Sequence, residues 1–168
     1  RCWYVVKFPL PASPSNLGPL PFPRQHEAYR RSRLGIGHPS FVNLDYYCSN
    51  RTFIGIGSGI PYLERYVPRL EKLFADGLHC HMYRTVDDAL RLCDRLLERE
   101  QDILLDDGER AAAYVLSRHS DSARFASALR TVAAFREASR CGAPAPLPEL
   151  DFFLPGVEPA DEVEHCVV

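Results

Sequence analysis

The chain lacks several signatures that would assign it quickly to a functional class. It has no apolar run near the ~18 residues needed to cross a bilayer, so no membrane partner is predicted. It has no CxxC pair, no Gly-x-Ser-x-Gly elbow and no glycine pattern of the dinucleotide-binding or P-loop type. A conventional phosphate-binding loop and a serine nucleophile are therefore not indicated, and we predict no cofactor.

What the chain does have is an ordinary globular composition with an uneven charge. Its 168 residues, 46% hydrophobic and 25% charged, suit one domain or one domain with an extension. Residues 1–72 hold ten Lys or Arg against four Asp or Glu, a balance of +6, whereas residues 73–168 carry −8. This split predicts either a basic face for an anionic partner or solvated acidic helices beside a basic loop region.

Cysteine use bears on the compartment. The six cysteines are Cys2, Cys48, Cys80, Cys93, Cys141 and Cys166. An even number could form three disulfides in a secreted chain, but Cys93 falls on the apolar face of a predicted helix, where a free thiol packs as a small hydrophobe. Reduced thiols in the cytoplasm or nucleus are favoured, and a secreted, disulfide-bonded recognition protein stays as an alternative.

The clearest order of elements lies between residues 51 and 97. Residues 51–56 are rich in aromatic and β-branched side chains and predict a strand, followed by a glycine turn at Gly57–Gly59. Pro61 opens a predicted helix that runs to Phe74, although Pro68 should bend it. A strand over Leu78–Arg84 follows, and then a long helix.

An earlier strand is predicted at Trp3–Phe8, before a segment with many prolines. These elements predict an α+β fold, with a small antiparallel three-stranded sheet packed by two helices in ββαβα order and a C-terminal helical extension. The predicted domains are 1–105, an α+β domain with a Pro-rich insertion over 9–50; 106–142, the helical extension; and 143–168, an acidic, Pro-containing tail.

The helices of the second half carry clear boundary signals. Thr85 begins a capping-box pattern, and the helix behind it extends to about Leu105, with Leu90, Cys93 and Leu97 expected in the core. Asp106-Asp107-Gly108 should end this helix, and a separate helix is predicted over 109–118. A last helix over 121–140 starts from Ser120 or Asp121 and ends at Cys141-Gly142.

The candidate catalytic residues are sparse. His79, Cys80 and His81 lie in the predicted strand, where alternation places the two histidines on one face and the cysteine on the other. They support an alternative function, a small metal-dependent or Cys/His hydrolase, but no further metal-ligand cluster is evident. The acidic pairs Asp87-Asp88 and Asp106-Asp107 suit helix starts better than a metal site, and we predict no metal-binding residue.

Three short motifs support a family resemblance. They are Tyr4-Val5-Val6, Gly59-Ile60-Pro61-Tyr62, and Tyr83-Arg84-Thr85-Val86-Asp87-Asp88-Ala89. In residues 3–8 and 52–97, the chain resembles the N-terminal hybrid-binding domain of eukaryotic ribonuclease H and the caulimovirus viroplasmin module. The resemblance implies a non-enzymatic binding module for an RNA–DNA hybrid or double-stranded RNA, or for a protein partner.

The resemblance also implies a binding surface at the turn and the first helix. By position, turn amides at Gly59, an aromatic ring at Tyr62 and basic groups at Arg65 and Arg69 would contact the nucleic acid. Gly57 joins them because a helix start offers free amides to an anion. Sequence therefore proposes five site residues and no catalytic one.

Overall fold

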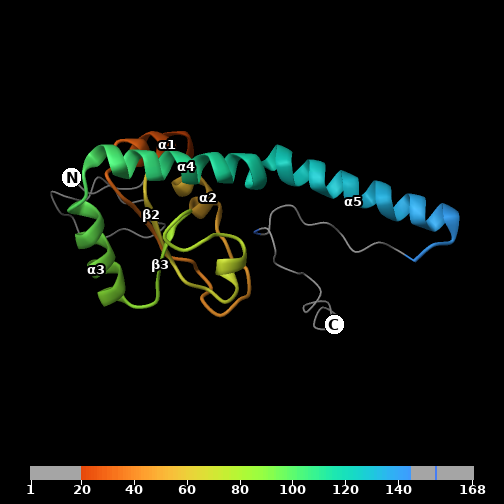
Figure 1. The fold of residues 1–168 in the computed structure, drawn as a ribbon, viewed down its shortest axis with the longest axis horizontal. Coiled ribbons are helices and arrows are strands. Elements are labelled where there is room, and N and C mark those ends of the chain that lie inside the picture. Colours follow the sequence, from red (N-terminus) through yellow and green to blue (C-terminus); the bar gives the residue numbers. More distant parts are fainter. Residues whose placement is uncertain (1–19, 145–153, 155–168) are drawn as a thin grey trace.

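The computed structural model describes residues 20–144 together with Leu154. Figure 1 shows the elements in order. They are α1 (Phe22–Arg30), β1 (Gly35–Gly37), α2 (Asn50–Ile56), β2 (Tyr62–Arg65), the short 3-10 helix η1 (Leu70–Lys72), β3 (His81–Tyr83), α3 (Val86–Leu97), α4 (Gln101–His119) and α5 (Asp121–Cys141). The strand predicted at Trp3–Phe8 lies outside the described residues, as does the tail apart from its first residues and Leu154.

The three strands form one parallel sheet in the order β1-β2-β3. Gly35 lies opposite Tyr62, and Leu63 lies opposite His81. An α+β chain with a small three-stranded sheet is thus confirmed, but the antiparallel arrangement predicted from the sequence is wrong. Parallel neighbours need a crossover connection. Here a loop with α2 joins β1 to β2, and a loop with η1 joins β2 to β3.

The segment predicted as the second strand is helix α2. Short apolar runs do not distinguish a buried strand from a buried helix. Three residues of α2 are buried, among them Thr52 and Gly55, and Gly55 faces the Tyr62 ring so closely that any side chain there would collide with it. Close packing on the sheet, rather than local propensity, selects the helix.

The segment predicted as the first helix, Pro61–Phe74, instead holds β2 and η1. Tyr62 and Leu63 are both fully buried. Because successive strand residues point to opposite faces, these two side chains belong to two different hydrophobic clusters, one on each side of the sheet. A strand buried on both faces is typical of parallel sheets. Pro68 follows β2, where it interrupts no helix.

Helix α3 begins as predicted but ends early and turns a different face inward. The Thr85 hydroxyl accepts the Asp88 amide, and the Asp88 carboxylate accepts the Thr85 amide, which completes a capping box. The helix ends at Leu97, and its buried residues are Ala89 and Leu96. The predicted core positions are therefore corrected, with Leu97 43% exposed. Of the other two predicted core residues, Leu90 is exposed and Cys93 is half-buried.

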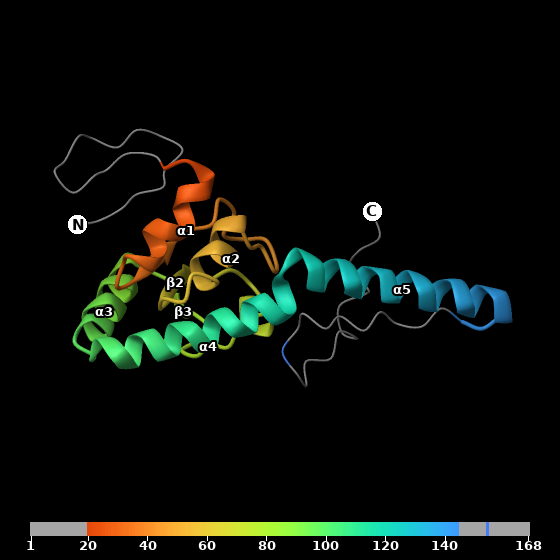
Figure 2. The same cartoon turned by 90° about the horizontal axis from the view of Figure 1, so that it is seen from above.

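Helix α4 is continuous from Gln101 to His119, so the predicted break at Asp106–Gly108 is wrong. Glycine is required at position 108 because the α4 backbone there lies against the backbone of the segment just before β2. A Cβ on Gly108 would lie 2.5 Å from the Gly59 carbonyl oxygen. Helix α5 starts from the predicted Ser120 cap, and Figures 1 and 2 show it projecting beyond the rest of the fold.

Two further expectations concern the membrane and the thiols. None of the helices within residues 20–144 is both long and apolar enough to cross a membrane. The free cysteines of this part of the chain are Cys48, Cys80, Cys93 and Cys141. The remaining cysteines, Cys2 and Cys166, lie outside the described residues.

Candidate functional site

The three strands of the sheet end together at its carboxyl edge. β1, β2 and β3 finish there at Gly37, Arg65 and Tyr83. The opposite edge is covered, because α4 packs against Gly59 just before β2. In Figure 1, α4 runs along the top and the turn from β3 into α3 lies at the bottom. Open parallel sheets bind ligands in the crevice outside the carboxyl ends of their strands.

A buried carboxylate lies directly beneath this edge. Glu64 of β2 is only 4% exposed, and its Oε2 accepts a hydrogen bond of 2.8 Å from the Thr52 hydroxyl. Burial raises the pKa of Glu64 from 4.5 to about 7, against the opposing effects of Thr52, the Arg65 amide and the Arg51 charge. Glu64 can therefore exchange a proton near neutral pH.

The backbone at Gly37, at the end of β1, leaves space for the Glu64 carboxylate. A Cβ on Gly37 would lie 2.7 Å from Glu64 Oε2 and would also collide with the Tyr62 hydroxyl, so only glycine fits at the end of β1. The Tyr83 hydroxyl donates to the Gly37 carbonyl at 2.7 Å and holds β1 in place. Burial, and then the Glu64 charge, raise the pKa of the Tyr62 phenol well above 10.

The Cys48 thiol, which feels the Glu64 charge, is not an activated nucleophile. Burial, followed by the Glu64 charge, raises the pKa of Cys48 to about 12. A reactive cysteine needs the opposite shift, toward the thiolate. Cys48 therefore packs as an apolar side chain behind the site.

Basic and aromatic groups follow the ends of β2 and β3. The guanidinium of Arg84, after β3, lies 3.5 Å from the centre of the Tyr66 ring, after β2. Nε of Arg65 is buried and meets no hydrogen-bond partner within the described residues. An unsatisfied guanidinium nitrogen at the end of the central strand has hydrogen-bonding capacity left for an anionic group.

The sequence candidates His79, Cys80 and His81 do not form a site. The His79 ring stacks on Tyr114 with centroids 3.6 Å apart, and its Nδ1 accepts the Ala75 amide. Burial raises the pKa of the Cys80 thiol well above 9 and lowers that of both histidines. No group of three or more His, Cys, Asp or Glu in the described part of the chain could hold a metal.

The five residues proposed from sequence are separated by the structure. Gly57 and Gly59 lie in the turn after α2, at the covered edge of the sheet, and Tyr62 is buried in the core. Arg65 ends β2, and Arg69 lies just before η1. Only the two arginines lie near the carboxyl edge, and no helical face joins the five.

The sequence analysis missed Glu64 and Thr52. The signal would have been a single acidic residue between Leu63 and Arg65, but the segment was interpreted as a helix, in which a carboxylate is ordinary. In a buried parallel strand the same residue must be hydrogen-bonded or protonated. Thr52 was missed because it was assigned to a strand.

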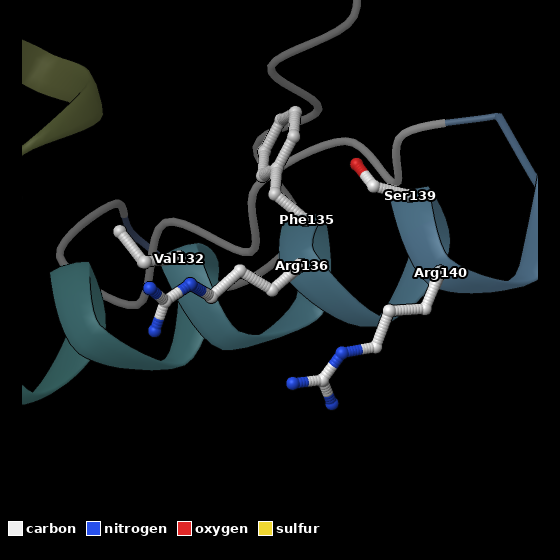
Figure 3. A pocket seen from close by; sticks show the side chains of 5 residues that line it. All are labelled: Val132, Phe135, Arg136, Ser139 and Arg140. Carbon is white, nitrogen blue, oxygen red and sulfur yellow. The ribbon is translucent and has the colours of Figure 1, made fainter.

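A cavity also lies far from the carboxyl edge, along α5. It has a volume of about 550 Å³, and Figure 3 shows the residues that line it. They are Val132, Phe135, Arg136, Ser139 and Arg140. All five come from one exposed helix face, and we assign no function to this cavity.

Comparison with known families gives one result. A family model described as glycosyl transferase-like matches residues 10–130, which is 121 of the 168 residues. Searches of curated proteins and of solved structures gave no match. The family match overturns the resemblance to hybrid-binding domains, which covered only residues 3–8 and 52–97, and with it the predicted non-enzymatic module for nucleic acid or protein. The hydrolase and secreted-recognition alternatives do not fit it either. The chain belongs to the glycosyl transferase-like family.

Proposed function

We propose that the chain takes part in glycosyl transfer and that the activated sugar donor binds at the carboxyl ends of β1 and β2. The observation that carries this proposal is the family match, which spans the sheet and helices α1 to α4. Helix α4 packs against Gly59 at the amino edge, and this favours the carboxyl edge as the location.

Glycosyl transfer sets clear chemical requirements for such a site. An acceptor oxygen forms a bond to the anomeric carbon, and the bond from that carbon to the leaving group breaks. The electron pair departs with the leaving group, usually a phosphate or diphosphate, and the acceptor proton passes to a base. The site must therefore stabilise negative charge on the leaving group, which positioned cations and hydrogen-bond donors do most effectively.

Arg65 fits the role of anion binder. It ends the central strand, and its Nε is buried without a hydrogen-bond partner among the described residues. Phosphate oxygens bound to this guanidinium would satisfy the buried nitrogen and neutralise charge at the same time. Of the five site residues proposed from the sequence, Arg65 is the one that we retain in the donor site.

Glu64 fits the role of a positioning residue. At 4% exposure its carboxylate cannot contact a sugar directly, but it accepts the Thr52 hydroxyl near the start of α2. It thereby joins the central strand to helix α2. Its pKa of about 7 makes this link sensitive to pH in the neutral range.

Calorimetric titration tests the proposal. The chain is titrated with uridine, guanosine and adenosine diphosphate hexoses, and the same titration is repeated with Arg65→Gln. We expect one donor class to bind and Arg65→Gln to weaken it about tenfold, as expected for one lost charge-assisted contact of ~1.4 kcal/mol. Arg136→Gln on α5 is the matched control and should bind like the wild type. Absence of binding by the wild type, or equal weakening in both variants, would refute the proposal.

A further inference from the structure

Two non-glycine residues adopt left-handed backbone conformations beside the carboxyl edge. They are Tyr46, with φ of 57°, and Arg69, with φ of 65°, and no other described non-glycine residue has a positive φ. Left-handed backbone is unfavourable for residues that carry a Cβ, so surrounding contacts must hold it. Such conformations concentrate at binding and catalytic sites.

Contacts between two loops hold this pair. The Tyr46 amide donates to the Pro68 carbonyl at 2.9 Å. Arg69 Nε lies 3.0 Å from an Asp45 carboxylate oxygen, and its guanidinium lies 5.9 Å from the Tyr46 ring centre. These contacts fasten the loop after β1 to the loop after β2, so the strain fixes a rigid surface at the edge of the sheet.

The loop after β1 presents unusual apolar surface at this point. Phe41 is 57% exposed and Leu44 is 52% exposed. The Phe41 ring meets the Tyr47 ring edge to face at 5.3 Å, which holds it in one orientation while leaving it accessible. Asp45, whose side chain is about half exposed, adds a carboxylate beside these groups. We call Phe41, Leu44, Asp45, Tyr46 and Tyr47 the aromatic rim.

We propose that the aromatic rim binds a pyranose ring of the saccharide acceptor. This inference rests on the proposed function, in which an acceptor oxygen must reach a donor held at the carboxyl edge. A pyranose has an apolar C–H face, which suits the exposed Phe41 ring, and outward hydroxyls, which can donate to the Asp45 carboxylate. The rim lies in the loop that follows β1, whose last residue, Gly37, stands at the carboxyl edge, and the Tyr46 amide joins that loop to Pro68 in the loop after β2.

The shape of the rim favours a sugar over an anionic ligand or an extended protein. Its charged groups, Asp45 and Arg69, are already paired with each other, which leaves a near-neutral surface. Neutral, polyhydroxylated rings need a flat apolar contact and a few fixed hydrogen-bond acceptors.

Saturation-transfer NMR on the full chain tests the inference. The probes are the methyl glycosides of glucose, galactose, mannose and N-acetylglucosamine, with sorbitol as a polyol that has hydroxyls but no ring face. At least one glycoside should bind, and Phe41→Ala should raise its Kd about tenfold. Phe125→Ala is the matched control, because Phe125 is a 67% exposed phenylalanine on α5. It should leave the Kd unchanged.

The outcomes separate this inference from the proposed function. If nucleotide-sugar donors bind but no glycoside binds, or Phe41→Ala binds glycosides as well as the wild type, the aromatic rim is not the acceptor site. Sorbitol binding equal to that of the glycosides would also refute it. If neither donors nor glycosides bind, the proposed function itself fails. Glycoside binding that Phe41→Ala abolishes and Phe125→Ala preserves supports the inference.

Discussion

Replacing Glu64 by glutamine should stabilise the protein at alkaline pH and leave its stability almost unchanged at acidic pH. The Glu64 carboxyl is buried, and its pKa rises from 4.5 to about 7 on folding. The folded protein therefore binds more protons than the unfolded chain between these values, and stability falls as pH rises from about 4.5 to about 7. Each pKa unit corresponds to about 1.36 kcal/mol, so the loss is on the order of 3 kcal/mol.

Glutamine removes this loss but keeps the hydrogen-bond acceptor for Thr52. Urea unfolding of the wild type and Glu64→Gln at pH 4.5 and pH 8 measures the effect as a difference at each pH. Subtracting the stability of the wild type from that of the variant at each pH removes the pH dependence contributed by other titrating groups. One of these is the buried His119, whose pKa falls to about 4. The exposed Glu109→Gln serves as the matched control. A Glu64→Gln difference that is equal at the two pH values would refute the buried, protonatable carboxyl.

Three further predictions concern the fold. Leu96→Ala should cost ~2–5 kcal/mol because Leu96 is buried, whereas its neighbour Leu97, largely exposed, should cost under ~1 kcal/mol on the same change, as measured by urea unfolding. Gly108→Ala should lower stability by at least ~1–3 kcal/mol and reduce the melting temperature, because the new methyl would meet the Gly59 carbonyl at 2.5 Å. Thr85→Ala should cost ~1 kcal/mol in the same assay through loss of the α3 capping box.

Capping signals in the sequence predicted two helix starts correctly, those of α3 and α5. Thr85 and Ser120 both cap helices as expected, because capping depends on residues within one turn of the chain. Gly142 ends α5 in the left-handed conformation that glycine allows. These features need no tertiary information, and they explain why the second half of the fold was predicted better than the first.

Features that depend on distant packing were predicted less well. Whether residues 52–56 form a strand or a helix was decided by the fit of Gly55 against the Tyr62 ring, and the sequence does not bring these two residues together. The inward face of α3 was set by where the sheet and α4 lie, so the buried residue is Leu96 rather than Leu97. Strand direction likewise followed from crossover connections that were not predicted.

The candidate site was missed for the same reason. Glu64 becomes notable only when its segment is a buried strand, since a carboxylate on an exposed helix is ordinary. The left-handed pair Tyr46 and Arg69 carries no sequence signal, because neither residue type favours that conformation. Phe41 fell within the predicted insertion over 9–50, and the contacts between the loops after β1 and β2 had no signal in the sequence.

An amide-resolved NMR titration of the labelled chain with nucleoside diphosphate sugars tests the central claim most directly. If the donor binds at the carboxyl edge, the amides of Gly37, Thr52 and Arg65 should shift in a saturable manner, while those of α4 and α5 stay in place. Shifts confined to the cavity along α5, or to the turn at Gly57–Gly59, would contradict the account.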